Sequence, residues 1–145
     1  MAVRDQIHDA VKAALIKAGW TIKDEPLTIR WDHTQLEIDL GAEKMLLAEK
    51  AEELIAVEVK SFLRSNSIPE LQKAVGQYLM YREALAANDP ERRIFLATHQ
   101  KVMTELLAQP QTAAFLHKYQ IHLLIVDIQQ EEIEQWIVQT SSAPF

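Results

Sequence analysis

One run of mainly β-branched and aliphatic residues, at positions 54–62, constrains the fold of this chain more than any other feature. Its composition predicts the clearest β-strand in the sequence. Because side chains alternate along a strand, Glu58 and Lys60 lie together on one face, while the neighbouring aliphatic side chains point to the other. A carboxylate and an ammonium group at the end of an apolar strand are costly to bury without a partner. A metal ion is one partner that would suit them.

Two amphipathic helices are predicted, one on each side of this strand in the sequence. The first covers residues 3–18, where apolar residues recur every four positions before Gly19 ends the helix. The second begins with a capping box, in which Ser67 accepts a hydrogen bond from the first turn and Glu70 reaches back. It ends at Asn88, just before an Asp-Pro pair.

The rest of the chain predicts strands and short helical segments. The segment 41–53 fits either a helix, by propensity, or the outgoing arm of a hairpin, and we favour the hairpin. The last two strands form a closing hairpin. Strands are expected at 27–31, 36–40, 93–97, 121–127 and 133–138, and helical segments at 100–107 and 111–119. This order predicts an α/β (α+β) fold, a single domain over residues 1–145 with a central mixed β-sheet flanked by helices.

Composition excludes several classes of protein. The 145 residues contain no cysteine, which excludes a disulfide scaffold, a thiolate zinc site and a cysteine nucleophile. The net charge of −6 argues against sequence-blind coating of nucleic acid, although it leaves room for a local basic groove. No apolar run is long enough to span a membrane, and the N-terminus lacks the apolar core of a signal peptide. We therefore expect a cytoplasmic protein with no membrane partner.

A second carboxylate lies upstream of the clearest strand. Asp39 ends the run 35–39, and a hairpin turning near residues 48–49 would set Asp39 opposite Glu58. We expect these two carboxylates to form a site for a hard divalent cation, Mg²⁺ or Mn²⁺, with Lys60 beside it. Such a trio suits hydrolysis of a phosphodiester, because the cation lowers the pKa of a water molecule and Lys60 neutralises charge that develops on phosphorus.

The second helix supplies a further set of polar residues. Gln77 and Tyr81 are four residues apart and therefore share one helix face, with Lys73 one turn earlier. This stripe flanks the apolar seam, so it can face the carboxylates. The alternative is that Gln77 and Tyr81 satisfy backbone groups and fill the core. By the same alternative, Glu58 and Lys60 form a weak ion pair on a solvated strand face.

Several of these residues resemble sequence signatures of known protein families. Asp39 with Glu58-Val59-Lys60 is similar to the D…E-x-K signature of restriction endonuclease-like nucleases, often written PD-(D/E)XK. Gln77-x-x-x-Tyr81 looks like the Q-x-x-x-Y motif of the RecB-type exonucleases. Over essentially its whole length, the chain resembles the XisH family of cyanobacterial fdxN-element excision controlling factors. Further matching positions are 4–5, 8, 39–43, 48–50, 55–62, 76–78, 81–82 and 136–137.

The resemblance implies a restriction endonuclease-like fold and assigns roles to residues. It places Asp39, Glu58, Lys60, Gln77 and Tyr81 in catalytic positions, and it makes Asp39, Glu58 and Val59 metal ligands. It also implies a role in the programmed excision of a DNA element, alongside a site-specific recombinase and a companion protein, XisI.

One segment departs from the family pattern. Before Asp39, such sequences tend to carry Gly, Lys and Asp with an aromatic residue, whereas residues 32–37 here read Asp-His-Thr-Gln-Leu-Glu. Glu37 shares a strand face with Asp39, so it either adds charge to the site or faces solvent. Asp5 and His8, near the start of the first helix, either add an acidic group to the site or serve as cap and surface residues.

Two classes of function stay open from the sequence. The first is a Mg²⁺-dependent endodeoxyribonuclease that acts on DNA during excision. The second is a non-catalytic DNA- or protein-binding regulator of a separate recombinase, since folds are often reused. Excision at two DNA ends suits a two-fold homodimer, and the apolar hairpin 121–138 either closes the sheet or offers an edge for pairing.

Overall fold

A computed structural model describes residues 3–46 and 51–140 of the protein, and only the backbone of residues 3–5, 40–46 and 51–52. In chain order the elements are α1 (Val3–Lys17), β1 (Thr21–Asp24), β2 (Leu27–Trp31), β3 (Thr34–Ile38), β4 (Leu40–Leu46), β5 (Ala51–Val59), α2 (Ile68–Asn88), β6 (Arg93–His99), α3 (Gln100–Val102), the π-helical turn η1 (Met103–Leu107), α4 (Pro110–Lys118), β7 (Leu123–Asp127) and β8 (Glu132–Ile137).

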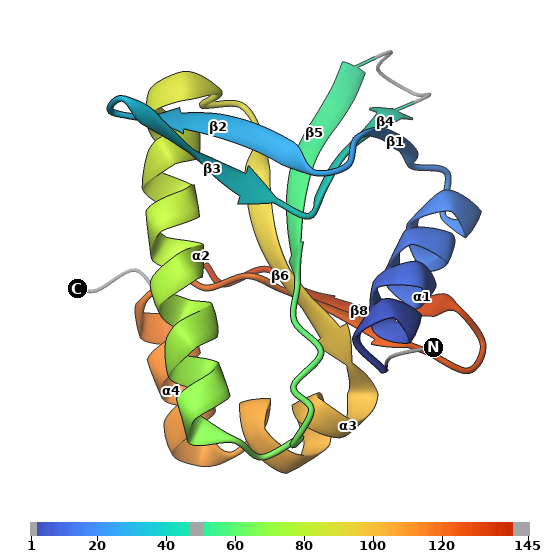
Figure 1. Ribbon diagram of the computed structural model, residues 1–145. Coiled ribbons are helices and arrows are strands. Elements are labelled where there is room, and N and C mark those ends of the chain that lie inside the picture. The colour runs from blue at the N-terminus through green and yellow to red at the C-terminus, as the bar shows by residue number, and fades with distance from the viewer. Residues whose placement is uncertain (1–2, 47–50, 141–145) are drawn as a thin grey trace.

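The middle layer is a six-stranded mixed sheet in the order β1-β4-β5-β6-β7-β8. Strands β5, β6 and β7 are parallel neighbours, whereas β4 and β8 join them antiparallel. Helix α1 covers one face of the sheet and α2 the other, and the small β2–β3 hairpin lies beside α2 (Figure 1). The predicted mixed α/β domain with flanking helices is therefore confirmed. Within the closing hairpin, β7 lies inside the sheet and β8 forms its edge.

The chain between α1 and β5 differs from the sequence prediction in two places. Strand β1 was not predicted, because its four residues are mostly exposed and show no apolar alternation. The predicted strand 36–40 is wrong as one strand, since the chain changes partner at Asp39. Before that residue β3 pairs with β2, and after it β4 pairs with β5. The register Leu46↔Ala51 confirms the hairpin arm and brackets the predicted turn at 48–49, which lies outside the described residues.

The start of α2 follows the predicted capping box only in part. The Ser67 side chain accepts a hydrogen bond from the Glu70 amide at 3.3 Å, as an N-cap does. The Glu70 carboxylate does not reach back to Ser67. It accepts the amides of Leu63 and Arg64 instead, both at 3.2 Å. Glu70 thereby ties the loop that follows β5 to the first turn of α2.

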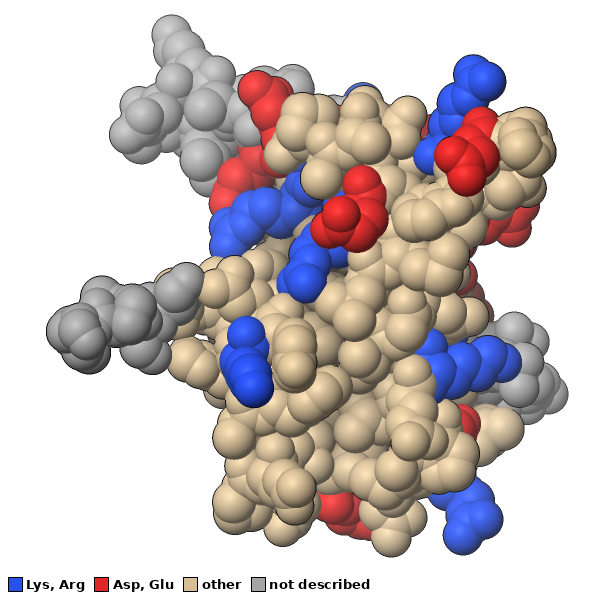
Figure 2. All heavy atoms as spheres, turned by 90° about the vertical axis from the view of Figure 1, so that its left-hand side faces the viewer, with Lys and Arg blue, Asp and Glu red and all other residues tan. Residues whose placement is uncertain are grey.

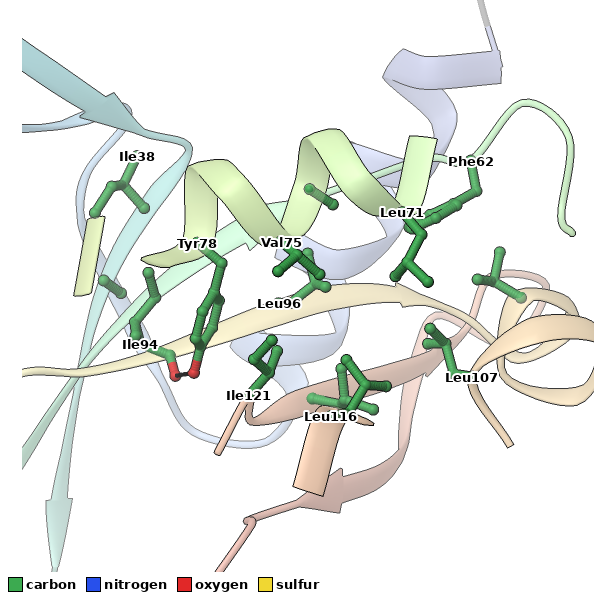
Figure 3. Close-up of a cluster of buried hydrophobic side chains, with 14 of the residues drawn as sticks. Ile38, Phe62, Leu71, Val75, Tyr78, Ile94, Leu96, Leu107, Leu116 and Ile121 are labelled. Atoms are coloured by element: carbon green, nitrogen blue, oxygen red, sulfur yellow. Dashed lines mark hydrogen bonds between the residues drawn. The ribbon is translucent and has the colours of Figure 1, made fainter. Parts of the chain in front are cut away.

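The face of the sheet under α2 is closed by a large apolar cluster centred on Tyr78 (Figure 3). Tyr78 is fully buried among side chains that include Val75 and Leu96. Its hydroxyl donates to the Ile94 carbonyl at 3.2 Å and accepts the His122 amide at 3.0 Å. One phenol therefore joins α2 to β6 and to the segment that leads into β7.

We expect Tyr78→Phe to lower the free energy of unfolding by roughly 1–2 kcal/mol, because it leaves a buried amide and carbonyl without their shared partner. Urea denaturation of the variant would measure this loss. Tyr119→Phe is the matched control, since the Tyr119 ring is exposed and its hydroxyl has no hydrogen bond to the described residues. Equal stability of the two variants would show that the buried hydroxyl contributes nothing.

The opposite face is closed by α1 and an aromatic group. The rings of Trp20 and Trp136 lie 5.9 Å apart, and the Phe95 ring lies 4.9 Å from Trp136. Lys17 at the end of α1 donates to the Gln130 carbonyl at 2.7 Å. The N-terminal helix is therefore fastened to the C-terminal hairpin. Among the described residues, no helix combines the length and the apolar character that a membrane crossing requires.

Candidate active site

The end of β5 positions two of the predicted site residues. Ala56 belongs to the α2-side cluster, whereas Ile55 and Val57 belong to the α1-side cluster, so the strand alternates as predicted. Glu58 therefore faces the side of α2. The Lys60 amide still donates to the Ala97 carbonyl at 2.9 Å, which keeps the chain aligned with β6 one residue beyond the strand.

Asp39 is positioned by the switch between the two sheets. It lies between β3 and β4, and the register Leu40↔Val57 brings it beside the end of β5. One oxygen of its side chain, Oδ2, accepts the Val59 amide at 3.0 Å. The structure thus brings Asp39 next to Glu58, through the backbone of the residue that separates Glu58 from Lys60.

Glu58 is the most unusual charged group of the site, because only 5% of its surface is exposed. Its Oε1 lies 3.4 Å from the Lys60 Nζ, while Oε2 is buried and has no hydrogen-bond partner among the described residues. Burial, followed by repulsion from Asp39, raises the pKa of Glu58 to about 7, against the opposing effect of Lys60. The site thus contains a carboxylate whose charge is incompletely compensated.

Asp39 and Glu58 open into a cleft of about 600 Å³ that is rich in acidic groups. Glu25, Glu37 and Tyr81 also line it. Burial and then the nearby carboxylates raise the pKa of Tyr81 to about 12, so its phenol keeps its proton at neutral pH. Tyr81 can therefore donate a hydrogen bond into the cleft. Glu37 is exposed and lines the cleft, so it both adds negative charge to the site and faces solvent.

Glu25 is a cleft residue that the sequence did not indicate. Its carboxylate contacts His8 Nε2 at 2.8 Å and Lys12 Nζ at 2.5 Å, and these contacts lower the pKa of Glu25, with the Lys12 hydrogen bond contributing most. His8 lines the same cleft. No motif marks Glu25, because it lies in a loop. The side chain of Asp5 lies outside the described residues.

The predicted helix stripe is divided between two hollows. Tyr81 lines the acidic cleft, and Lys73 lines a smaller pocket of about 200 Å³ together with Lys60. Gln77 lies between them on α2, and its Oε1 is buried without a hydrogen-bond partner in the described part of the chain. No hydrogen bond within residues 3–46 and 51–140 joins Gln77 to Asp39, Glu58 or Lys60.

The donor atoms fit a hard divalent cation. Two carboxylates lie side by side, and Glu58 Oε2 is a buried oxygen for which the described residues provide no hydrogen-bond partner. Mg²⁺ is usually bound by one or two carboxylates, with water and substrate oxygens completing its octahedron. In the described ranges, no group of three His, Cys, Asp or Glu side chains is arranged to hold a metal.

Proteins of known structure are similar to this chain in both fold and sequence. The family model described as XisH protein matches residues 1–134. A structure of an XisH family protein from Nostoc punctiforme PCC 73102 is 40% identical, with a TM-score of 0.82, over 92% of this chain and 99% of that one. A structure of a fdxN element excision controlling factor protein from Anabaena variabilis is 38% identical, with a TM-score of 0.83 and the same coverage. No curated protein matches the chain.

Proposed function

Since this chain belongs to the XisH family, we propose that it is a DNA-element excision controlling factor that hydrolyses DNA phosphodiesters with Mg²⁺ or Mn²⁺. The observation that carries this proposal is the buried Oε2 of Glu58, which has no hydrogen-bond partner among the described residues although Asp39 and Lys60 lie next to this side chain. A buried carboxylate is costly unless it is paired or coordinates a metal, so the site favours a cation.

The proposal gives each residue a role. Asp39 and Glu58 would hold the cation, together with the backbone of Val59. When bound, the cation polarises a phosphoryl oxygen and lowers the pKa of a water molecule. Lys60 neutralises the negative charge that develops on phosphorus. Tyr81, which keeps its proton, donates a hydrogen bond to a substrate oxygen.

The same proposal extends to the fold and the cellular setting. We assign the sheet with α2 and the Asp39–Glu58–Lys60 trio to the restriction endonuclease-like class, with Gln77 and Tyr81 as its helical motif. The protein would act on DNA in the cytoplasm, in concert with a site-specific recombinase and an XisI-type companion.

A second candidate function is a non-catalytic regulator that binds DNA or a protein partner. One observation favours it: Phe115 on α4 and Tyr119, directly after that helix, are 39% and 44% exposed, and their rings are in tilted contact with centroids 5.0 Å apart. Aromatic side chains are enriched at protein interfaces. This pair lies outside the acidic cleft, so a companion protein could cover it without closing the site.

The deciding experiment is a Mg²⁺ titration of the wild-type protein and the Asp39→Asn variant, combined with cleavage assays on single-stranded, duplex and branched DNA. We expect Asp39→Asn to weaken Mg²⁺ binding by about tenfold, equivalent to roughly 1.4 kcal/mol, because a neutral amide replaces an anionic ligand. Its stability should not fall, since an amide oxygen can still accept the Val59 amide.

Asp9→Asn is the matched control, because Asp9 is exposed on α1 and outside the cleft. It should bind Mg²⁺ as the wild type does. A folded wild-type protein that binds neither Mg²⁺ nor Mn²⁺ at millimolar concentration and cuts no form of DNA would contradict the nuclease proposal. The regulatory function would then be favoured, and Asp39→Asn should leave excision in cells unchanged.

A further inference from the structure

A further polar pocket borders α2 on a different side from the acidic cleft. Tyr81 lines the cleft and the next residue, Arg82, lines this pocket; because successive residues of a helix project about 100° apart, the two hollows meet different sides of α2. The pocket has a volume of about 200 Å³, and its polar lining consists of Arg82, Arg92, Arg93 and His122. No carboxylate of the described residues lines it. Figure 2 shows this side of the molecule, where several basic side chains lie close to acidic ones on a surface that is otherwise largely uncharged.

Two of the arginines are held in place by the fold. Arg82 Nη1 donates to the carbonyls of Tyr119 and Gln120, at 2.8 and 3.0 Å. Arg92 Nη1 donates to the Ile55 carbonyl at 2.8 Å, and its Nε to Asp89 at the same distance. These bonds occupy only part of each guanidinium, which has five N–H donors. The remaining donors have no partner in the described part of the chain.

The positive charge of the pocket is compensated only in part. Asp89 pairs with Arg92, but neither Arg82 nor Arg93 forms an ion pair with a carboxylate in the described ranges. Arg93 is exposed at the start of β6, with its guanidinium carbon 5.6 Å from the centroid of the Phe95 ring. Among the described residues, the three guanidinium groups thus form a single ion pair, that of Arg92 with Asp89.

His122 adds a donor of defined direction. Its Nδ1 accepts the Gln139 amide at 3.0 Å, which places the ring proton on Nε2 in the neutral tautomer. Burial, followed by the charges of Arg93 and Arg82, lowers the pKa of His122, so the ring is neutral near pH 7. The polar side chains of the pocket consequently offer N–H donors from α2, the start of β6 and the segment before β7.

We propose that Arg82, Arg92, Arg93 and His122 form a binding site for a phosphate group. Guanidinium groups bind phosphate through paired N–H donors, and these bonds are stronger when both partners are charged. N–H donors from three separate segments suit a tetrahedral oxyanion better than a planar carboxylate, because they approach from different directions and can bind several oxygens of one phosphate group. The group is either a free phosphate or a phosphodiester of a nucleic acid. The site does not depend on the proposed hydrolysis, since none of its four residues lines the acidic cleft that Glu58 lines.

The test is calorimetric titration of the full chain with inorganic phosphate, at low ionic strength and without divalent cations. We expect one saturable site in the wild type and at least about tenfold weaker binding by Arg93→Gln. This variant should fold normally, because the Arg93 side chain is exposed and makes no hydrogen bond to the described residues. Arg30→Gln removes an exposed arginine outside the pocket and should bind phosphate as the wild type does. No saturable binding, or equal losses in both variants, would overturn the proposal.

Binding of labelled single-stranded and duplex oligonucleotides in EDTA distinguishes the two sources of phosphate. Competition by inorganic phosphate, together with weaker oligonucleotide binding by Arg93→Gln, assigns the site to the nucleic-acid backbone. Unchanged oligonucleotide binding by a variant that has lost phosphate binding assigns it to a free phosphate. Asp39→Asn should keep full phosphate binding in either case, so a failed nuclease proposal and a failed phosphate site give different results.

Discussion

Lys60→Ala is expected to lower the rate of DNA cleavage by about 10²–10³, the usual effect of losing one group that stabilises charge in the transition state. Mg²⁺ binding should remain nearly intact, because the ammonium group is not a metal ligand. Stability should fall slightly or not at all, since the change removes the cation 3.4 Å from Glu58. Single-turnover cleavage rates at saturating Mg²⁺ would measure the effect.

Lys101→Ala is the control for this substitution. The Lys101 side chain is 68% exposed and lies 3.9 Å from Glu105, away from the cleft. Its cleavage rate should equal that of the wild type. If Lys60→Ala cleaved DNA as fast as the wild type, Lys60 would have no part in the chemistry.

Glu58→Gln is expected to stabilise the metal-free protein at alkaline pH. The folded protein binds the Glu58 proton more tightly than the unfolded chain does, because the pKa rises from 4.5 to about 7 on folding. The wild type therefore loses stability as the pH rises through this window, and each pKa unit is worth about 1.4 kcal/mol. The variant should be more stable than the wild type by up to about 3 kcal/mol at pH 8 and equally stable at pH 4.

Urea denaturation across this pH range, with and without Mg²⁺, would test the expectation. Added Mg²⁺ should stabilise the wild type at pH 8 and the variant much less, because the cation replaces the proton on Glu58. A Glu58→Gln variant that is less stable than the wild type at pH 8 without metal would contradict the inference that the negative charge of Glu58 destabilises the metal-free protein.

The elements that bury apolar faces could be predicted from the sequence. Strand β2 matches the predicted range 27–31, and α2 ends at Asn88 as expected. Strand β1 could not be predicted, because a short, exposed edge strand is held by backbone pairing with β4 and leaves no apolar pattern. The break at Asp39 could not be predicted either, because it leaves the apolar pattern unchanged. The alternation of apolar and polar residues continues through Asp39, although the chain pairs with β2 before this residue and with β5 after it.

The candidate site was predictable only where its residues form a motif. Glu58 and Lys60 share a strand face by simple alternation, and Asp39 was placed beside them by the expected hairpin. Glu25 was not predicted as a site residue, because it lies in a loop and no local sequence pattern indicates its contact with His8. The phosphate pocket was missed because Arg82 and His122 are distant in sequence and meet only when α2 packs against the sheet.

The attachment of α1 to the C-terminal hairpin has a consequence for synthesis of the chain. Helix α1 is the first described element to be made, yet its packing partners include Val126 and Trp136 near the other end. The apolar face of α1 cannot be fully covered until β8 has been translated, because Trp136 lies on that strand. Until then part of this face stays exposed on the nascent chain, and transiently exposed apolar surface is prone to aggregation.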